Sequence, residues 1–284
     1  MLRRFRKLDR PLLGVVAALA GYGLLMLYSA GRTDVPTFVS AIWQRQLVWL
    51  GLGIVCAVLV FRVSPRLLEW ATPYVYGLAM FVLLLTLLFG TGAGTAAGSH
   101  SWISINGTRL GQPAELAKLA VILMLARWLA ERRDPPASLR DLAYPGLIAL
   151  APFILVLLQP DLGSAIVFVA ILFSMLYWAG TRPALLLLLA SPVIGLVLAF
   201  STAVWGAWIV LLAGLVLWVR PYVREGVAVM LANVAMGVLA LPFWRHLAPY
   251  QQNRLLAFLN PEADPRATGW HIIQSKVAIG SGGW

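Results

Sequence analysis

Charged side chains within apolar stretches are the residues of this chain best suited to chemistry. Glu115 and Lys118 lie in the apolar stretch Pro113–Leu129, three residues apart, so on a helix they share one face. A charge at the centre of a bilayer costs roughly 2–3 kcal/mol or more, so it needs a partner or a polar cavity. The spacing leaves both interpretations open. The two residues form either a structural ion pair near the membrane surface or the floor of a cavity for a charged ligand.

A third acidic residue, Asp161, lies between two apolar stretches, in the run Gln159-Pro160-Asp161-Leu162-Gly163-Ser164. Asp is a preferred N-cap residue, because its side chain accepts a hydrogen bond from a free backbone N–H of the first helical turn. The sequence therefore predicts a helix that begins after Asp161. We favour this capping role over a direct role in catalysis. Asp161 could serve in both roles if the end of the helix also lines a cavity.

Basic residues gather in two polar segments. Arg109 lies in one, and Arg254, His271 and Lys276 lie in the other, which ends in a glycine-rich run. Basic side chains and glycine-rich backbone amides are the groups that bind phosphate oxygens, so together they could clamp a pyrophosphate. A basic loop that faces solvent or lipid headgroups is the alternative, and the basic residues taken alone favour it. The sequence holds no metal-ligand spacing, Ser-His-Asp arrangement, P-loop or dinucleotide fingerprint.

Composition excludes a water-soluble protein. Hydrophobic residues make up 61% of the 284 residues and charged residues only 12%, about half the usual share. In a soluble protein the net charge of +11 would indicate nucleic acid as a partner. Here the basic residues flank long apolar stretches, so we expect membrane lipids as the surroundings and no nucleic acid.

The fold class that we expect is all-α, a polytopic helical bundle with about nine transmembrane helices and a cytoplasmic N-terminus. Each apolar stretch is close to the ~20 residues that cross a bilayer. The expected spans are Pro11–Ala30, Leu47–Phe61, Trp70–Gly90, Pro113–Leu129, Ala143–Leu158, Leu162–Ala179, Ala184–Phe200, Ala203–Val219 and Gly226–Trp244.

The distribution of basic residues supports this topology. With the N-terminus inside, 14 of the 22 basic residues fall in inside segments and 7 outside, as the positive-inside rule requires. Two segments, at about 91–111 and 245–284, are then extracytoplasmic loops. We expect residues 1–284 to form a single transmembrane domain.

At these residues the chain resembles the SEDS family (shape, elongation, division and sporulation) of bacterial cell-wall polymerases, over essentially its whole length. The matching blocks are Ser101-Trp102-Ile103, Gln112-Pro113-Ala114-Glu115 with Lys118, Gln159-Pro160-Asp161-Leu162-Gly163, and Tyr250 through Gly283. Within the family, Gly269-Trp270-His271 resembles the Gly-Tyr-His triplet of the RodA branch, whereas the division branch, FtsW, usually carries Gln at the last position.

The resemblance implies a peptidoglycan glycosyltransferase that polymerises lipid II into glycan strands for elongation and rod shape. It implies location in the bacterial cytoplasmic membrane, a class B penicillin-binding protein as partner, and association with the elongation machinery. Cationic groups would stabilise the departing undecaprenyl pyrophosphate, namely Arg254, Arg109 and Lys118. The remaining substrate-binding residues would be Trp102, Gln112, Glu115, Asp161, His271 and Lys276, with Trp102 stacking on a sugar. No cofactor is evident, and a divalent cation is left open.

Two departures from the family pattern stand out. The stretch Ala184–Trp244 holds three expected spans where a typical member has one. The chain also stops at Trp284, before the loop in which the family carries its catalytic Asp. We therefore expect no catalytic base in this chain, and we expect the chain to be the N-terminal part of a longer one.

Two other function classes stay open. A lipid II flippase also uses charges within the membrane, but it needs polar residues through the inner half of several spans. Those parts of the expected spans are nearly bare of polar residues here. A membrane scaffold for a partner transpeptidase is the third class, and the family resemblance permits it.

Overall fold

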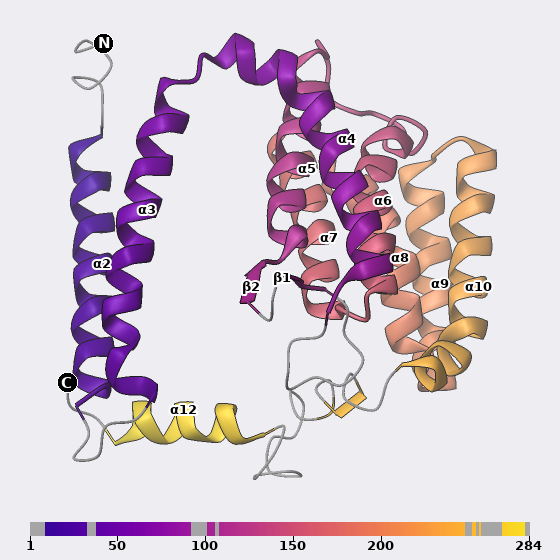
Figure 1. Cartoon of the computed structure of the whole chain (residues 1–284). Coiled ribbons are helices and arrows are strands. Elements are labelled where there is room, and N and C mark those ends of the chain that lie inside the picture. Colours follow the sequence, from indigo (N-terminus) through magenta and orange to yellow (C-terminus); the bar gives the residue numbers. More distant parts are fainter. Residues whose placement is uncertain are drawn as a thin grey trace. The chain divides into compact units, whose positions relative to one another are not determined.

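The computed structural model describes residues 9–32, 38–91, 101–105, 108–247, 252–253, 256 and 269–281 (Figure 1). The chain divides into two compact units, Met1–Leu68 and Glu69–Trp284. We describe each unit by itself.

The first unit contains a pair of helices, α2 (Arg10–Ala30) and α3 (Ile42–Arg62). The short 3-10 helix Phe38–Ala41 directly precedes α3. Asp9 caps α2, since its Oδ1 accepts a hydrogen bond from the backbone N–H of Leu12 at 3.1 Å. The two helices pack against each other, and the rings of Tyr28 and Trp43 meet edge to face with their centroids 5.6 Å apart. Neither helix has a buried residue, as expected for apolar helices that face lipid.

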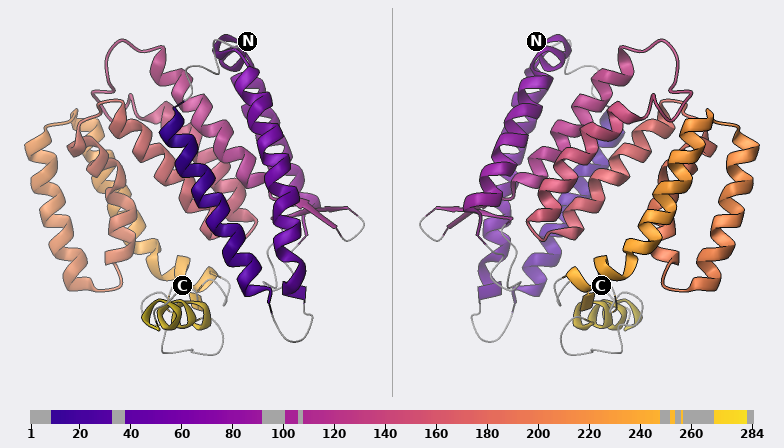
Figure 2. Two further views of the ribbon diagram at one scale, coloured as in Figure 1. Left: turned by 90° about the vertical axis from the view of Figure 1, so that its left-hand side faces the viewer. Right: turned by 90° about the vertical axis from the view of Figure 1, so that its right-hand side faces the viewer.

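Among the described residues of the second unit, seven consecutive helices form a bundle (Figure 2). They are α4 (Pro65–Phe89, whose first turn precedes the unit), α5 (Pro113–Ala130), α6 (Ala143–Leu158), α7 (Leu162–Trp178), α8 (Pro183–Leu198), α9 (Thr202–Val219) and α10 (Val223–His246). Helices α5, α6 and α7 pack on one another around a core that includes Val121, Leu125 and Phe168. Helices α8, α9 and α10 form a second group around Leu188 and Leu212.

Each of the nine expected spans falls in one of the helices α2 to α10, so the prediction of a helical, multi-pass membrane protein is confirmed. Five helices, α2, α3, α4, α9 and α10, are long and apolar enough to cross a membrane. Helices α6, α7 and α8 are apolar but have only 16 or 17 residues, and α5 carries Glu115, Lys118 and Arg127. The count of nine spans and the orientation of the N-terminus therefore stay predictions.

Neither expected loop is a loop throughout. Within 91–111, β1 (Ile103–Ile105) pairs antiparallel with β2 (Thr108–Gly111). The sequence favours this hairpin, because Ile and Ser alternate in β1 and an Asn-Gly dipeptide, which is typical of hairpin turns, comes next. Within 245–284, Trp270–Gly280 forms the helix α12, because its apolar residues and good helix formers outweigh the polar ones. Helices α3 and α10 also begin earlier than expected, at Ile42 and Val223, since exposed polar residues extend a helix past its apolar part.

Prolines inside helices shape the bundle. A proline has no N–H, so the carbonyl four residues earlier loses its helical partner. Pro152 of α6 leaves the carbonyl of Ile148 free in this way, and the Tyr76 hydroxyl of α4 donates to that oxygen at 2.9 Å. A neighbouring helix thus supplies the hydrogen bond that the proline removes.

The same arrangement recurs at a second proline. Pro73 of α4 frees the carbonyl of Glu69, which accepts a hydrogen bond from Nη1 of Arg127 on α5 at 3.2 Å. Both bonds attach α4 to the helices beside it. In an apolar environment such bonds add specificity, because an unsatisfied carbonyl would have no water to bond.

A third proline lies at the centre of the α8–α10 group. Pro192 frees the carbonyl of Leu188, and the Ser191 hydroxyl donates to it at 2.7 Å. Asn233 of α10 donates to Ser191 Oγ at 2.8 Å and accepts from Nε1 of Trp208 on α9 at 3.1 Å. Ser191 and Asn233 are completely buried, so this chain of hydrogen bonds joins all three helices from within.

Glycines make room for this close packing. A Cβ on Gly195 would lie 2.8 Å from Asn233 Oδ1, and one on Gly237 would lie 2.5 Å from the ring of Trp205. Small residues at helix interfaces let backbones approach closely in membrane bundles. The three helices within Ala184–Trp244 are therefore a specifically packed group.

Candidate functional site

Polar side chains of α5 and α7 meet at one end of the second unit. The strand β2 leads directly into α5, and Gln112 stands at the N-cap position between them, followed by Pro113 at the first helical position. Pro suits that position because its missing N–H would be free there in any case. Helix α7 begins at the same end, after Asp161. Figure 1 shows the hairpin and the start of α5 at this end of the bundle.

The side chain of Gln112 ties these two helix starts together. Its Nε2 donates to Oδ2 of Asp161, and the same nitrogen lies 3.2 Å from the hydroxyl oxygen of Ser164. Oδ1 of Asp161 accepts a hydrogen bond from the backbone N–H of Ser164 at 3.1 Å. Asp161 therefore caps α7 as the sequence predicts, and its carboxylate also orients a side chain of α5.

Gln159, in the turn before Asp161, makes a contact with α4. Gln159 is completely buried, and its Nε2 donates to the carbonyl oxygen of Leu83 at 2.9 Å. The turn Gln159–Asp161 is thus held on one side by α4 and on the other by Gln112. A buried amide with a hydrogen bond is a strong positional constraint, because breaking the bond leaves a polar group in an apolar core.

Glu115 and Lys118 form the ion pair that their spacing allows. Nζ of Lys118 lies 2.7 Å from Oε1 of Glu115. The Lys118 side chain is 18% exposed, whereas that of Glu115 is 60% exposed. The Lys118 side chain is therefore mostly covered by the bundle and the Glu115 side chain is largely exposed, so an anion that displaced Glu115 would meet a lysine that the bundle holds in place.

The hairpin is anchored to the end of α4. Thr91 and Trp102 exchange backbone hydrogen bonds of 2.8 and 3.2 Å, and the hydroxyls of Thr91 and Ser104 lie 2.9 Å apart. Trp102 is partly exposed and Ser101 is buried beside it. The indole is thus presented from a fixed backbone at the same end as Gln112.

A protein-family model described as "Cell cycle protein", which covers FtsW, RodA and SpoVE, matches residues 10–213 and 197–284. The chain belongs to this family. The two matched ranges overlap at 197–213, inside the stretch in which the sequence predicts additional helices. The expected membership of the SEDS family is confirmed. Three of the four matching blocks, those around Trp102, Gln112 and Asp161, lie at one end of the bundle.

Named relatives extend the comparison. The chain is 31% identical to the peptidoglycan glycosyltransferase RodA of Treponema pallidum (strain Nichols), over 97% of this chain and 69% of that protein. It is 31% identical to the probable peptidoglycan glycosyltransferase FtsW of Trichlorobacter lovleyi, over 99% of this chain and 63% of that protein. The chain thus spans between three fifths and seven tenths of the length of these relatives.

A solved structure is similar as well. One chain of a peptidoglycan synthase complex, solved to describe the coordination of polymerization and crosslinking, matches with a TM-score of 0.60 and 30% identity. The match covers 96% of this chain and 65% of that one. The helical arrangement of this chain is therefore similar to that of the matched chain.

Four other predicted substrate-binding residues, Arg109, Arg254, His271 and Lys276, are not part of the cluster in the described part of the chain. The backbone of Arg109 pairs with Ser104 in the hairpin, but its side chain lies outside the described part, as does that of His271. Arg254 lies outside the described residues altogether. Lys276 is exposed on α12. The predicted pyrophosphate clamp by these basic residues stays a prediction.

Three residues that the site prediction omitted contribute to the cluster. Ser164 contacts both Gln112 and Asp161, Gln159 fixes the turn from α4, and Thr91 anchors the hairpin. The signal for Ser164 is its position three residues after an N-cap, where side chains contact the cap. In the part of the chain that the structure describes, no three His, Cys, Asp or Glu side chains gather as metal ligands would.

Proposed function

We propose that this protein is a peptidoglycan glycosyltransferase that polymerises lipid II at the outer face of the cytoplasmic membrane. The observation that carries the proposal is the polar cluster of Gln112, Asp161, Glu115 and Lys118. It is built from family blocks in a chain whose relatives are named as peptidoglycan glycosyltransferases. The cluster lies at one end of an otherwise apolar bundle, where a lipid-linked sugar would meet it.

The proposed reaction joins two lipid-linked units. A sugar hydroxyl of the acceptor attacks the anomeric carbon of the donor, the carbon–oxygen bond to the pyrophosphate breaks, and the hydroxyl proton passes to a base. Negative charge then develops on the undecaprenyl pyrophosphate that leaves. Lys118, mostly buried and held at 2.7 Å from Glu115, would stabilise that charge, with Arg109 and Arg254 as the further cations.

The other residues of the cluster would shape the substrate site. Asp161 is occupied by the Ser164 N–H and by Gln112, and Glu115 is paired with Lys118. A base should instead have free access to the acceptor hydroxyl. We therefore assign Asp161 and Glu115 to positioning, Trp102 to sugar stacking, and no base among the described residues.

The proposed setting follows from the charge distribution. The N-terminus lies in the cytoplasm, nine helices cross the cytoplasmic membrane as a single domain, and the segments at 91–111 and 245–284 face outward. Exposed apolar side chains along α2, α3 and α10 support the membrane setting. Under this topology the loops rich in arginine, including Arg132 and Arg140, face the cytoplasm, as the positive-inside rule favours.

The proposed partner is a class B penicillin-binding protein, with which the protein would serve the elongation machinery. The similarity to a chain of a peptidoglycan synthase complex supports this partner class. The resemblance of Gly269-Trp270-His271 to the RodA triplet supports elongation over division, while relatives of both branches are about equally identical to this chain.

A polymerase and a flippase are separated by an assay without a bilayer. The full-length protein that carries these residues is purified in detergent micelles and given labelled lipid II, and the products are separated by length. A polymerase makes glycan strands there, because the reaction needs only the site and its substrate. A flippase leaves lipid II unchanged in micelles and moves it only across vesicle membranes, and that outcome would refute the proposal.

A further inference from the structure

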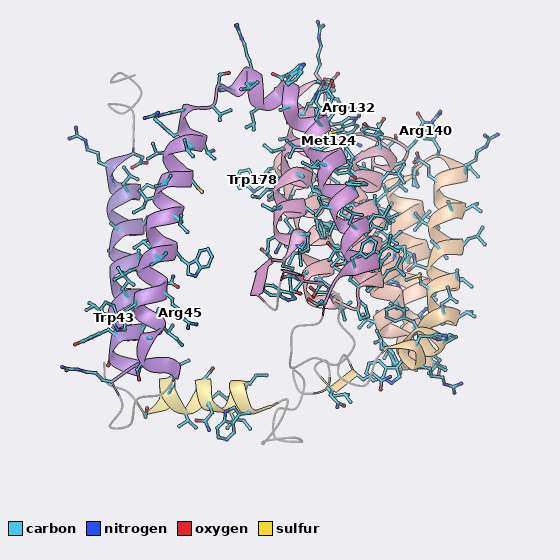
Figure 3. The ribbon with its side chains drawn as sticks, viewed as in Figure 1. Trp43, Arg45, Met124, Arg132, Arg140 and Trp178 are labelled. Carbon is cyan, nitrogen blue, oxygen red and sulfur yellow. The ribbon has the colours of Figure 1, made fainter. Side chains whose placement is uncertain are left out.

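Arginines surround the end of the α6–α10 bundle that lies away from the Gln112 cluster. Arg140 precedes α6, Arg182 precedes α8, and Arg220 ends α9 in a left-handed conformation. All three side chains are exposed, and among the described residues none forms an ion pair. Figure 3 shows Arg140 at this end of the bundle. Three guanidinium groups that form no ion pair within the described part of the chain thus lie at one end of a bundle of apolar helices.

A groove of about 690 Å³ begins at Arg140 and runs between α6, α7, α8 and α10. Its lining is apolar except for Arg140 and Glu225, and it includes Gly146, Phe153 and Pro192. The volume lies within the ~300–1,000 Å³ of typical ligand sites. A chain of methylene groups suits such a lining, because each buried CH₂ contributes about 0.8 kcal/mol.

A polar cavity of about 280 Å³ adjoins the groove at Glu225, which lines both. Arg182, Arg220 and Tyr222 line this cavity, together with Ser138. Glu225 is the acidic residue of its lining, and its carboxylate accepts a hydrogen bond from the backbone N–H of Arg140 at 3.0 Å. The cavity therefore keeps a net positive charge toward an incoming anion.

We propose that this combination is a binding site for one anionic diacyl phospholipid of the surrounding membrane. Arg182 and Arg220 bind the phosphate in the polar cavity, Arg140 contacts the headgroup from the other side of Glu225, and an acyl chain occupies the groove. Basic pockets between transmembrane helices at a membrane surface are suited to anionic headgroups. Guanidinium groups bind phosphate oxygens in pairs, which adds geometric specificity.

The charge at the mouth of the groove favours a lipid over a protein segment as the occupant. An apolar helix that covered the groove would bury the exposed guanidinium of Arg140, which forms no ion pair with Glu225, at a high desolvation cost. A phospholipid provides the phosphate for the arginines and the apolar tail for the groove at once. It also explains why α8 and α10, joined through Ser191 and Asn233, leave an open apolar surface on the α6 side.

The test is native mass spectrometry of the purified protein with phosphatidylglycerol or phosphatidylcholine of identical acyl chains. We expect phosphatidylglycerol to bind at least about tenfold more tightly. The double variant Arg182→Gln/Arg220→Gln should lose this preference. Arg133→Gln, at the same end but outside both cavities, should keep it.

A glycine pair tests the groove itself. A Cβ on Gly146 or on Gly214 of α9 would meet nothing within 4 Å, so both positions have open space where a side chain begins. Only Gly146 lines the groove. Gly146→Leu should abolish tight phosphatidylglycerol binding, and Gly214→Leu should leave it intact. Equal binding of the two lipids, or full binding to the Gly146→Leu variant, would overturn the proposal.

Discussion

The side-chain amide of Gln112 donates to the carboxylate of Asp161, so the start of α5 is tied to the start of α7. A hydrogen bond to a charged group contributes about 1.5–3 kcal/mol, and its loss leaves a carboxylate that is only partly solvated. The contact joins two blocks of the family pattern that are 49 residues apart in sequence. It is therefore the relationship on which the shape of the proposed substrate site depends.

Replacing Gln112 tests this relationship. Gln112→Ala should lower the free energy of unfolding by about 1–3 kcal/mol and speed hydrogen exchange at the Ser164 amide, which Asp161 then holds less firmly. Gln44→Ala on α3, where the side chain is exposed, is the control and should change neither quantity. Unchanged exchange at Ser164 in the Gln112 variant would show that Asp161 does not depend on α5.

The bond between Tyr76 and the carbonyl of Ile148 predicts a specific coupling with Pro152. Tyr76→Phe should destabilise the protein by about 1 kcal/mol, because the carbonyl that Pro152 leaves without its helical N–H then loses the Tyr76 donor as well. In a Pro152→Ala background the helix itself supplies an N–H to Ile148, so the same change should cost much less. A thermal-unfolding double-mutant cycle measures this difference. Equal costs in both backgrounds would refute the compensation.

Gly195 and Asn233 should be coupled in a similar way. Gly195→Ala places a Cβ 2.8 Å from Asn233 Oδ1 and should destabilise the α8–α10 group by about 1–3 kcal/mol. In an Asn233→Ala background that clash is absent, so the added methyl should be tolerated. Gly206→Ala is the matched control, since its Cβ meets nothing within 4 Å. It should stabilise α9 by about 0.5–1 kcal/mol.

A pH-dependent change is expected in the loop between α5 and α6. The Ser138 hydroxyl, together with the Ala137 and Ser138 amides and Arg132, lowers the pKa of Asp141 from its ordinary 3.8. Because the folded-state pKa is the lower one, this stabilisation is complete above 3.8 and disappears as the pH falls through the folded-state value. Hydrogen exchange at the Ala137 amide should accelerate over that acid range.

The control for this prediction is Asp141→Asn. The Asn side chain cannot titrate. The Asp141→Asn variant should therefore show faster hydrogen exchange at the Ala137 amide at neutral pH. In acid, its exchange rate should change only as that of an unstructured peptide does. A wild-type loop whose exchange shows no acid transition would contradict the assigned role of Asp141.

The sequence predicted the helices well, because apolar stretches near twenty residues have few alternatives to a transmembrane helix. It also predicted the Asp161 cap, and it left the pairing of Glu115 with Lys118 as one of two open interpretations, since both features depend on local spacing. The bond from Gln112 to Asp161 could not be predicted, because it depends on how α5 packs on α7. Helix α12 was missed because its polar residues, among them Gln274 and Lys276, resemble those of a loop.

The central claim is that cations at the end of the bundle near Gln112 stabilise a departing pyrophosphate during lipid II polymerisation. The most direct measurement is the rate of glycan-strand formation from lipid II by the purified full-length protein that carries these residues, and by two single variants of it. Lys118→Ala should slow polymerisation about ten- to a hundredfold, since a charge-assisted contact in the transition state is lost. Arg224→Ala, exposed on α10 toward the other end, should leave the rate within about twofold. Equal rates for the two variants, or no polymer from the unaltered full-length protein, would contradict the account.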